Sequence, residues 1–299
     1  MGMLRVWLRR FTLIAVVAVS AATLAVTPAL ADPGPDPSPE CALWERRVYA
    51  ITTDGGLVEH KYCLDVTRVV SRWTSSRVVA TEGWADTSAV FWSGERYGDG
   101  AFYRVSASLG RLYWSRDLSS WQQVSKGSTT DWRAFTSLVS PEPGVIYGTD
   151  KSGAVRQWAH YGWQDGTGTV TDSRVVAMLP KASRLLGQTD DGFVGLDGTN
   201  TDAVASTWSV KFIRGPVRIT VPPTVALSEQ VVPFDLGNRY PTSAFALTNA
   251  GTLAVLIPRG CSTPDRTWDV SEEIGDGYRQ VFAGGYVRNG AGPVEWQCV

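Results

Sequence analysis

Five short segments with a β-type pattern each break at a glycine and resume on an aliphatic side chain. The interrupting glycines are Gly55, Gly110, Gly153, Gly192 and Gly251. Successive glycines lie 55, 43, 39 and 59 residues apart. Glycine tolerates the positive φ of a tight turn, so each segment predicts a β-hairpin. A hairpin cannot bury its own apolar face, and repeats at this spacing predict one all-β body, a β-propeller of five four-stranded blades.

Residues 1–31 have the pattern of a secretory signal peptide. Arg5, Arg9 and Arg10 precede an apolar run that leads to the triplet Ala29-Leu30-Ala31. An uncleaved membrane anchor is the alternative, although an apolar run of about 16 residues is shorter than the roughly 20 that a spanning helix needs. Residues 32–40 alternate proline with small or acidic residues and predict an extended spacer. We therefore expect a secreted, extracellular protein that leaves the membrane after cleavage and whose propeller occupies residues 41–299.

The net charge of the chain limits which classes of partner are expected. The formal net charge is -1, and loss of the three signal-peptide arginines makes the remaining chain more acidic. Proteins that bind phosphate backbones usually carry a basic face, so nucleic acid is not an expected partner. We expect a monomer without a cofactor.

Four cysteines in an exported chain predict two disulfides. Cys41 and Cys63 flank the first hairpin segment, while Cys261 and Cys298 lie in the last part of the chain. We favour pairing within each of these two sets. The rival pairing of Cys41 with Cys298 would join the two ends directly. Metal ligation is the other use of four cysteines, but no close CxxC pair occurs, so we expect no metal site.

Residues 127–155 carry a longer pattern, GSTTDWRAFTSLVSPEPGVIYGTDKSGAV. A glycine-containing loop leads to Trp132 and Phe135, and the turn glycine Gly144 precedes an aliphatic-Tyr-Gly strand at 145–149. This pattern resembles the blade repeat of the tachylectin family. The match fixes several residue types over a long segment, so it is more specific than a single short motif.

Other parts of the chain carry the same resemblance less fully. The loop aromatic is Trp84 in GWADTSAVF and Tyr278 in IGDGYRQVFAGG. The pentapeptide SRVVA begins at Ser76 and again at Ser173. Residues 214–227 depart from the pattern because prolines stand where the loop aromatic would be, which puts any site on that loop in doubt.

The resemblance implies a five-bladed propeller that binds N-acetylated amino sugars at equivalent sites between blades. The expected partners are glycans that contain N-acetylglucosamine or N-acetylgalactosamine, bound by several sites at once. Sugars stack on aromatic rings while carboxylates and other polar groups bind their hydroxyls. The carbohydrate-binding residues that we expect are Asp131, Trp132, Arg133, Trp84, Asp86, Asp276, Tyr278 and Arg279.

The same residues also have a structural interpretation. Loop tryptophans in propellers often wedge between neighbouring blades, and Asp131 and Asp276 are also suited to capping turns. Trp114 and Trp158 stand at strand positions after their turn glycines, where we expect core packing.

Catalysis is not expected, because the residues that it needs are not brought together. His60 and His160 follow their turn glycines by five and seven residues, a phase that does not place them in one pocket. Asp54, Asp150 and Asp191 stand at hairpin turns, where Asp is common for backbone reasons. No GxSxG, HExxH or phosphate loop occurs. The alternative to a lectin is a protein-interaction propeller without sugar binding or, less favoured, a glycan-active enzyme on the same fold.

Overall fold

The computed structural model describes residues 44–65, 70–94, 100–171, 173–179, 184–189, 192–197, 204–208, 218–220, 224–225, 232–233, 244–259 and 265–288. The chain divides into Met1–Asp36 and Pro37–Val299, and every described residue belongs to the second part. The predicted signal peptide and spacer, together with Cys41, Cys261 and Cys298, lie outside the described residues. Over the described ranges, no helix has the length and apolar character to cross a membrane.

The described residues form an all-β fold, as predicted, with one short 3-10 helix, η1 (Trp132–Ala134). Group A joins both ends of the described chain and contains β20 (Tyr278–Arg288), β1 (Trp44–Thr52), β2 (Leu57–Asp65) and β3 (Val70–Ala80). Group B contains β4 (Ala89–Gly94), β5 (Gly100–Val105), β6 (Leu112–Ser115) and β7 (Gln122–Gln123). Group C contains β8 (Phe135–Glu142), β9 (Val145–Asp150), β10 (Ala154–Ala159) and β11 (Arg174–Met178).

Two further groups complete the sheets. Group D contains β12 (Arg184–Thr189), β13 (Gly192–Asp197), β14 (Val204–Trp208) and β15 (Arg218–Thr220). Group E contains β16 (Val232–Pro233), β17 (Ala244–Leu247), β18 (Leu253–Arg259) and β19 (Asp265–Ile274). Neighbouring strands within each group are antiparallel, whereas short parallel pairings join β4 to β8 and β15 to β19.

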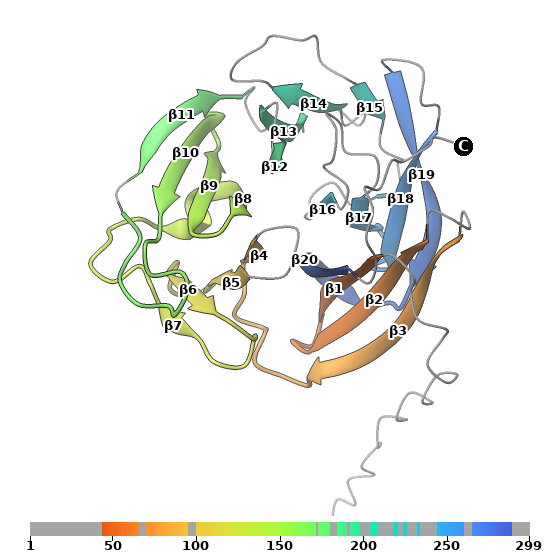
Figure 1. The fold of residues 1–299 in the computed structure, drawn as a ribbon, viewed down its shortest axis with the longest axis horizontal. Helices are drawn as coiled ribbons and strands as arrows, with labels where there is room; N and C mark the ends of the chain where they lie inside the picture. The colour runs from red at the N-terminus through yellow and green to blue at the C-terminus, as the bar shows by residue number, and fades with distance from the viewer. Residues whose placement is uncertain are drawn as a thin grey trace, which may run out of the picture. The chain divides into compact units, whose positions relative to one another are not determined.

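The first strands of the groups lie next to one another. They contact in the order β20, β4, β8, β12 and β16, and β16 contacts β20 again (Figure 1). Each group therefore follows the previous one, and the order closes on itself.

The middle strands are apolar on both faces because each group packs against two others. On β9, Ile146 joins a cluster with Leu112 of group B, whereas the next residue, Tyr147, joins a cluster with Leu185 of group D. Both residues of this pair are buried. Burial of both faces explains why apolar residues follow one another directly at 145–147, without the strict alternation of a sheet with one face in water.

The turn glycines have the predicted role in four of the five segments. Gly55, Gly110, Gly153 and Gly251 stand between the second and third strands of groups A, B, C and E, and all have positive φ. The fifth predicted hairpin, RLLGQTDDGFV, also forms, but from the first two strands of group D, β12 and β13, and Gly192 is the first residue of β13. The segment RLLGQTDDGFV has the pattern of a hairpin, and this pattern alone does not distinguish the first hairpin of a group from the second.

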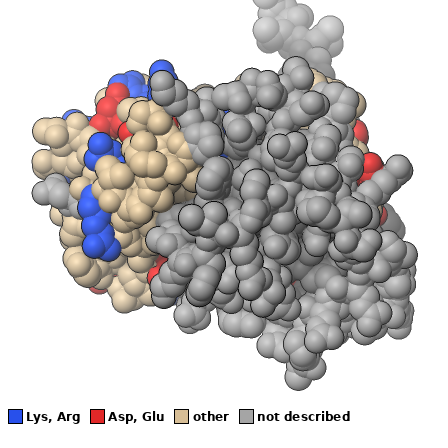
Figure 2. All heavy atoms as spheres, turned by 90° about the horizontal axis from the view of Figure 1, so that it is seen from above, with Lys and Arg blue, Asp and Glu red and all other residues tan. Residues whose placement is uncertain are grey.

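The visible described surface mixes charges of both signs. Figure 2, which views the molecule from above, shows Lys and Arg atoms on this surface with Asp and Glu atoms close to some of them. This mixture agrees with a formal net charge near zero.

Candidate functional site

One hydrogen bond recurs between successive groups and places the loops that were predicted to bind sugar. The carbonyl oxygen of each turn glycine accepts a bond from the backbone N–H of a residue in the loop that leads to the next group. The pairs are Trp84 with Gly55 (3.0 Å), Trp132 with Gly110 (3.0 Å), Leu179 with Gly153 (2.7 Å) and Tyr278 with Gly251 (2.9 Å). The backbone of each predicted loop aromatic is therefore hydrogen-bonded to the turn of the preceding group. Leu179 is the equivalent residue in the loop that leads to group D.

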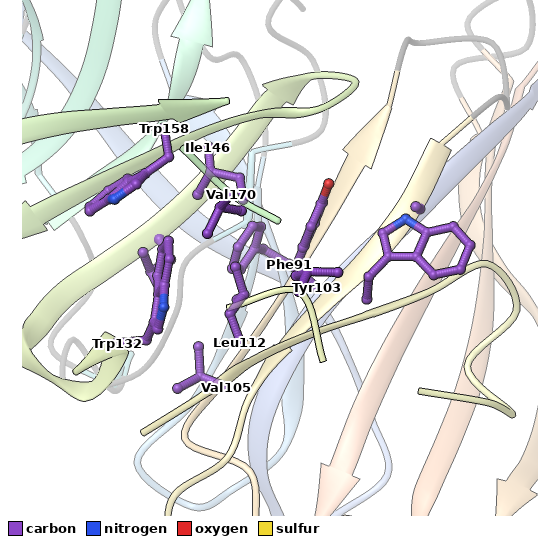
Figure 3. Close-up of a cluster of buried hydrophobic side chains, with 12 residues drawn as sticks. Phe91, Tyr103, Val105, Leu112, Trp132, Ile146, Trp158 and Val170 are labelled. Carbon is purple, nitrogen blue, oxygen red and sulfur yellow. The ribbon is translucent and has the colours of Figure 1, made fainter. Parts of the chain in front are cut away.

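The stacking role predicted for Trp132 is wrong, because its ring does not reach solvent. The side chain is 1% exposed and lies in a cluster formed by groups B and C (Figure 3). Its ring centroid is 4.7 Å from that of Trp158 and 6.0 Å from that of Phe135. The ring wedges between two groups, as the structural interpretation expected. Trp114 and Trp158 are buried in the same cluster, which confirms their predicted core role.

Trp84 and Tyr278 are also buried, so their predicted stacking roles are wrong for the same reason. Trp84 is 3% exposed and packs between groups A and B, with Phe282 at 6.1 Å between ring centroids. Tyr278 is 9% exposed and packs between groups E and A. Its hydroxyl is hydrogen-bonded to Nε2 of His60 at 2.9 Å. Three equivalent aromatics thus serve as wedges between groups.

The predicted polar residues are exposed, except for half-buried Arg279, but most of them hold loops together. Asp131 caps η1 and accepts three hydrogen bonds from Arg133, which lower the pKa of its carboxyl. Arg133 also donates through Nη1 to the carbonyl oxygens of Ala107 and Ser108, both at 3.1 Å. Asp86 accepts bonds from the hydroxyl of Ser106 (2.7 Å) and the N–H of Ser108 (2.6 Å). The loops before groups B and C are therefore both fastened to the turn between β5 and β6.

The two remaining predicted residues differ from each other. Arg279 donates hydrogen bonds to the carbonyl oxygens of Trp84, Ala85 and Thr87, so it fastens the start of β20 to the loop before group B. Asp276 is exposed in the turn before β20. The sequence thus identified a set of loop residues that contact one another, but most of their polar groups bind protein atoms.

A polar groove lies beside this network, formed by the turn between β5 and β6, the end of β7 and the loop from β7 through η1. Its volume is about 470 Å³, and residues 109–111, 123, 125–131 and 133 line it. Asp131 and Arg133 contribute to the lining, whereas Trp132, between them in sequence, points into the core. Pockets of this size hold small ligands. The groove is therefore the candidate functional site.

Local structure fixes both walls of the groove. On one side, Gly110 has φ +63°, a conformation that other residues rarely adopt, and a Cβ atom there would clash with the carboxylate of Asp131. On the other side, the N–H of Ser128 donates to the carbonyl of Ser125 at 3.1 Å. The N–H of Thr130 donates to Oγ of Ser128 at 3.1 Å. These bonds make residues 125–130 a compact turn, in which the side chains of Lys126, Ser128 and Thr129 are exposed.

Sequence reasoning missed most of the groove. Lys126, Thr129 and Thr130 were not singled out, although they stand at or beside the glycine-containing loop that carries the family resemblance. Leu109 was also missed, and its side chain is 57% exposed at the rim. The available signal was the dense run of hydroxyl residues after Lys126, which lacks the apolar alternation of a strand.

The two histidines are buried in separate places, as their phase predicted. His60 is hydrogen-bonded to Oγ of Ser76 (2.7 Å) and to the Tyr278 hydroxyl. His160 is hydrogen-bonded to the Tyr103 hydroxyl (2.8 Å) and to the carbonyl of Thr167 (2.9 Å). Burial lowers the pKa of His60 to about 4 and also lowers that of His160. Both rings are therefore neutral members of the packing near pH 7.

Cys63 is buried on β2 and disulfide-bonded. Its partner lies outside the described residues, which contain no other cysteine. The pairings of Cys41 with Cys63 and of Cys261 with Cys298 therefore stay predictions.

Comparisons with known proteins give no family. No protein-family model matches the chain, and no curated protein matches it. Among solved structures, it is similar to a protein from Lactobacillus plantarum, with 14% identity, 76% of this chain and 67% of that chain covered, and a TM-score of 0.31. It is also similar to the six-bladed β-propeller lectin of Aleuria aurantia, described for its fucose recognition, with 12% identity, coverage of 77% and 79%, and a TM-score of 0.29. These TM-scores are too low to support an inference about this chain.

Proposed function

We propose that this protein is an exported carbohydrate-binding β-propeller with five blades. Groups A to E would be the blades, and the closed order of contacts among their first strands supports this arrangement. The pairing of β1 with β20 supports it further, because a propeller is held shut when one blade contains strands from both ends of the chain.

The observation that carries the binding proposal is the polar groove formed by group B and the loop that follows it. It presents hydroxyl groups of Ser and Thr, the amide of Gln123 and the charges of Lys126 and Arg111 on a rigid frame. Such groups bind sugar hydroxyls, and exposed Leu109 offers an apolar surface for the C–H face of a ring. In this proposal the groove replaces the aromatic platform that the sequence predicted.

The proposal keeps the sugar class that the family resemblance implies. The ligands would be glycans containing N-acetylglucosamine or N-acetylgalactosamine, and the protein would act by binding them without catalysis. Equivalent loops at other group boundaries would supply further sites, and several weak sites on one rigid body would give adhesion to a surface that repeats the sugar.

Blocking the groove tests the proposal. Thr129→Trp should reduce retention on immobilised N-acetylglucosamine polymer at least about tenfold, because the indole would occupy the space of a sugar ring. Thr169→Trp is the matched control, since Thr169 is exposed and does not line the groove. Equal retention of the two variants, or no retention of the unmodified protein, would contradict binding at this groove.

A protein-interaction scaffold is the second candidate, and exposed aliphatic residues favour it. Val78 on β3 is 64% exposed and Met178 on β11 is 62% exposed. Both stand in edge strands at the two SRVVA copies: β3 contains the first copy, and the second begins one residue before β11. Competition by free monosaccharide separates the candidates, because a lectin is displaced by its sugar and an interaction scaffold is not.

A further inference from the structure

The charges that line the groove do not cancel. Asp131 supplies the carboxylate of the lining, and Arg133 binds it through N, Nε and Nη2 at 3.1, 2.8 and 2.8 Å. The remaining donor of Arg133, Nη1, is used by two backbone carbonyl groups. This pair is therefore neutral as a unit and has few bonding positions left for a ligand.

Two cations remain in the lining without a carboxylate beside them. Nη1 of Arg111 donates to Oε1 of Gln123 at 3.2 Å, and the amide carries no charge. Lys126 stands on the compact turn at 125–130, with an exposed side chain. The ion pairs formed among the described residues include neither Arg111 nor Lys126. The groove consequently has an excess of positive charge.

We propose that the groove selects saccharides that carry a carboxylate over neutral sugars of the same class, an inference that rests on the proposed carbohydrate binding. The carboxylate contacts Arg111 and Lys126, while the ring hydroxyls contact the Ser and Thr side chains of the turn. A guanidinium presents two parallel N–H donors that match the two oxygens of a carboxylate. An N-acetylated amino sugar with an acidic substituent combines both requirements.

The exposure of Arg111 and Lys126 to solvent limits how strongly the groove can prefer an acidic sugar to a neutral one. Arg111 and Lys126 are exposed, so water and salt screen their attraction for an anion. Two unit charges in contact at a protein surface attract each other only weakly, because the surrounding water has a high dielectric constant. A net preference of about three- to tenfold at low ionic strength is therefore expected, and added salt should reduce it.

The test compares two sugars that differ by one acidic group. The full-length protein is titrated with N-acetylglucosamine and with N-acetylmuramic acid, which adds a lactyl carboxylate, and with lactate alone. The expected result is about three- to tenfold tighter binding of N-acetylmuramic acid at 50 mM NaCl, with a smaller ratio at 500 mM NaCl. Lys126→Gln should bring the ratio toward one, and Lys126→Arg should restore it. Lys151→Gln removes the same charge from the exposed turn after β9 and should leave the ratio as it is.

The outcomes separate this inference from the proposed function. Equal affinity for the two sugars in the unmodified protein would overturn the charge preference and leave carbohydrate binding supported. Absence of binding to either sugar would overturn both. Binding of lactate as tight as that of N-acetylmuramic acid would also overturn the inference, because the groove would then recognise an anion without a sugar.

Discussion

Truncation of Trp132 to alanine is expected to lower the free energy of unfolding by about 3–5 kcal/mol. The indole is 1% exposed and fills the space between groups B and C, where Leu112, Ile146 and Trp158 surround it. Its removal takes apolar surface out of the core and leaves a cavity that two rigid sheets close only in part. Urea unfolding followed by near-ultraviolet circular dichroism measures the change.

Tyr161→Ala is the control for this prediction. The tyrosine is 81% exposed, and truncation at such a position usually changes stability by less than about 0.5 kcal/mol. If Trp132→Ala were as stable as the unmodified protein and lost sugar binding instead, the burial of this ring would be wrong and the stacking role predicted from the sequence would be recovered.

Acidification is expected to destabilise the protein through His60. Burial lowers the pKa of this imidazole from 6.5 to about 4, although the charge of Glu59 acts in the opposite direction. The unfolded chain therefore binds a proton near pH 6.5, whereas the folded protein binds it only near pH 4. Between these values the unfolded state holds more protons, so stability falls as the pH falls. The loss approaches about 3 kcal/mol, at about 1.4 kcal/mol per pKa unit.

Other groups with a lowered pKa act in the same direction, among them His160 and Glu59. The pKa of His160 is lowered by burial, so its contribution is also lost on acidification. Burial of Glu59 favours its neutral form, but bonds from Arg77 and Tyr49 outweigh this effect and hold its pKa below the usual value. Its contribution is present at neutral pH and is lost as the pH falls through the lowered pKa.

Comparison with the His60→Gln variant isolates the contribution of His60 to the pH dependence of stability. Glutamine keeps polar atoms near Ser76 and Tyr278 but does not titrate. Urea midpoints are measured at several values between pH 7 and pH 4 for both proteins. The stability of the unmodified protein should fall more steeply over this interval, and parallel pH profiles would show that His60 does not titrate as its burial requires.

The sequence predicted the sheets better than it predicted the site. Glycines at Gly55, Gly110, Gly153 and Gly251 marked real hairpins because positive φ is a local requirement that one residue type meets. Gly192 marked the first hairpin of group D, whereas the other four glycines mark the hairpin of the second and third strands. A local sequence pattern does not show which hairpin of a group it belongs to. The all-β class could be predicted because these glycine turns and the β-type segments beside them are also local features of the sequence.

The sequence near each loop aromatic does not determine whether its side chain points to solvent or into the core. A tryptophan suits either a sugar platform or a wedge between sheets, and the choice at Trp132 depends on Leu112 and other side chains of the preceding group. The contacts of the predicted polar residues also depend on segments distant in sequence, since Arg133 donates to carbonyl groups of the turn at 107–108. The groove forms only when the segments 109–111 and 125–133 meet, and that contact depends on how the loop after β7 folds back onto the turn between β5 and β6.

The pairing of β1 with β20 has a consequence for how the chain is made. During synthesis β1 emerges from the ribosome long before β20, and its hydrogen-bonding edge remains open during that interval. Closure depends on contacts between segments distant in sequence, a class that forms slowly. The sheet of group A therefore stays incomplete until the last described strand, β20, has been synthesised, so the whole chain must be made before this sheet can form.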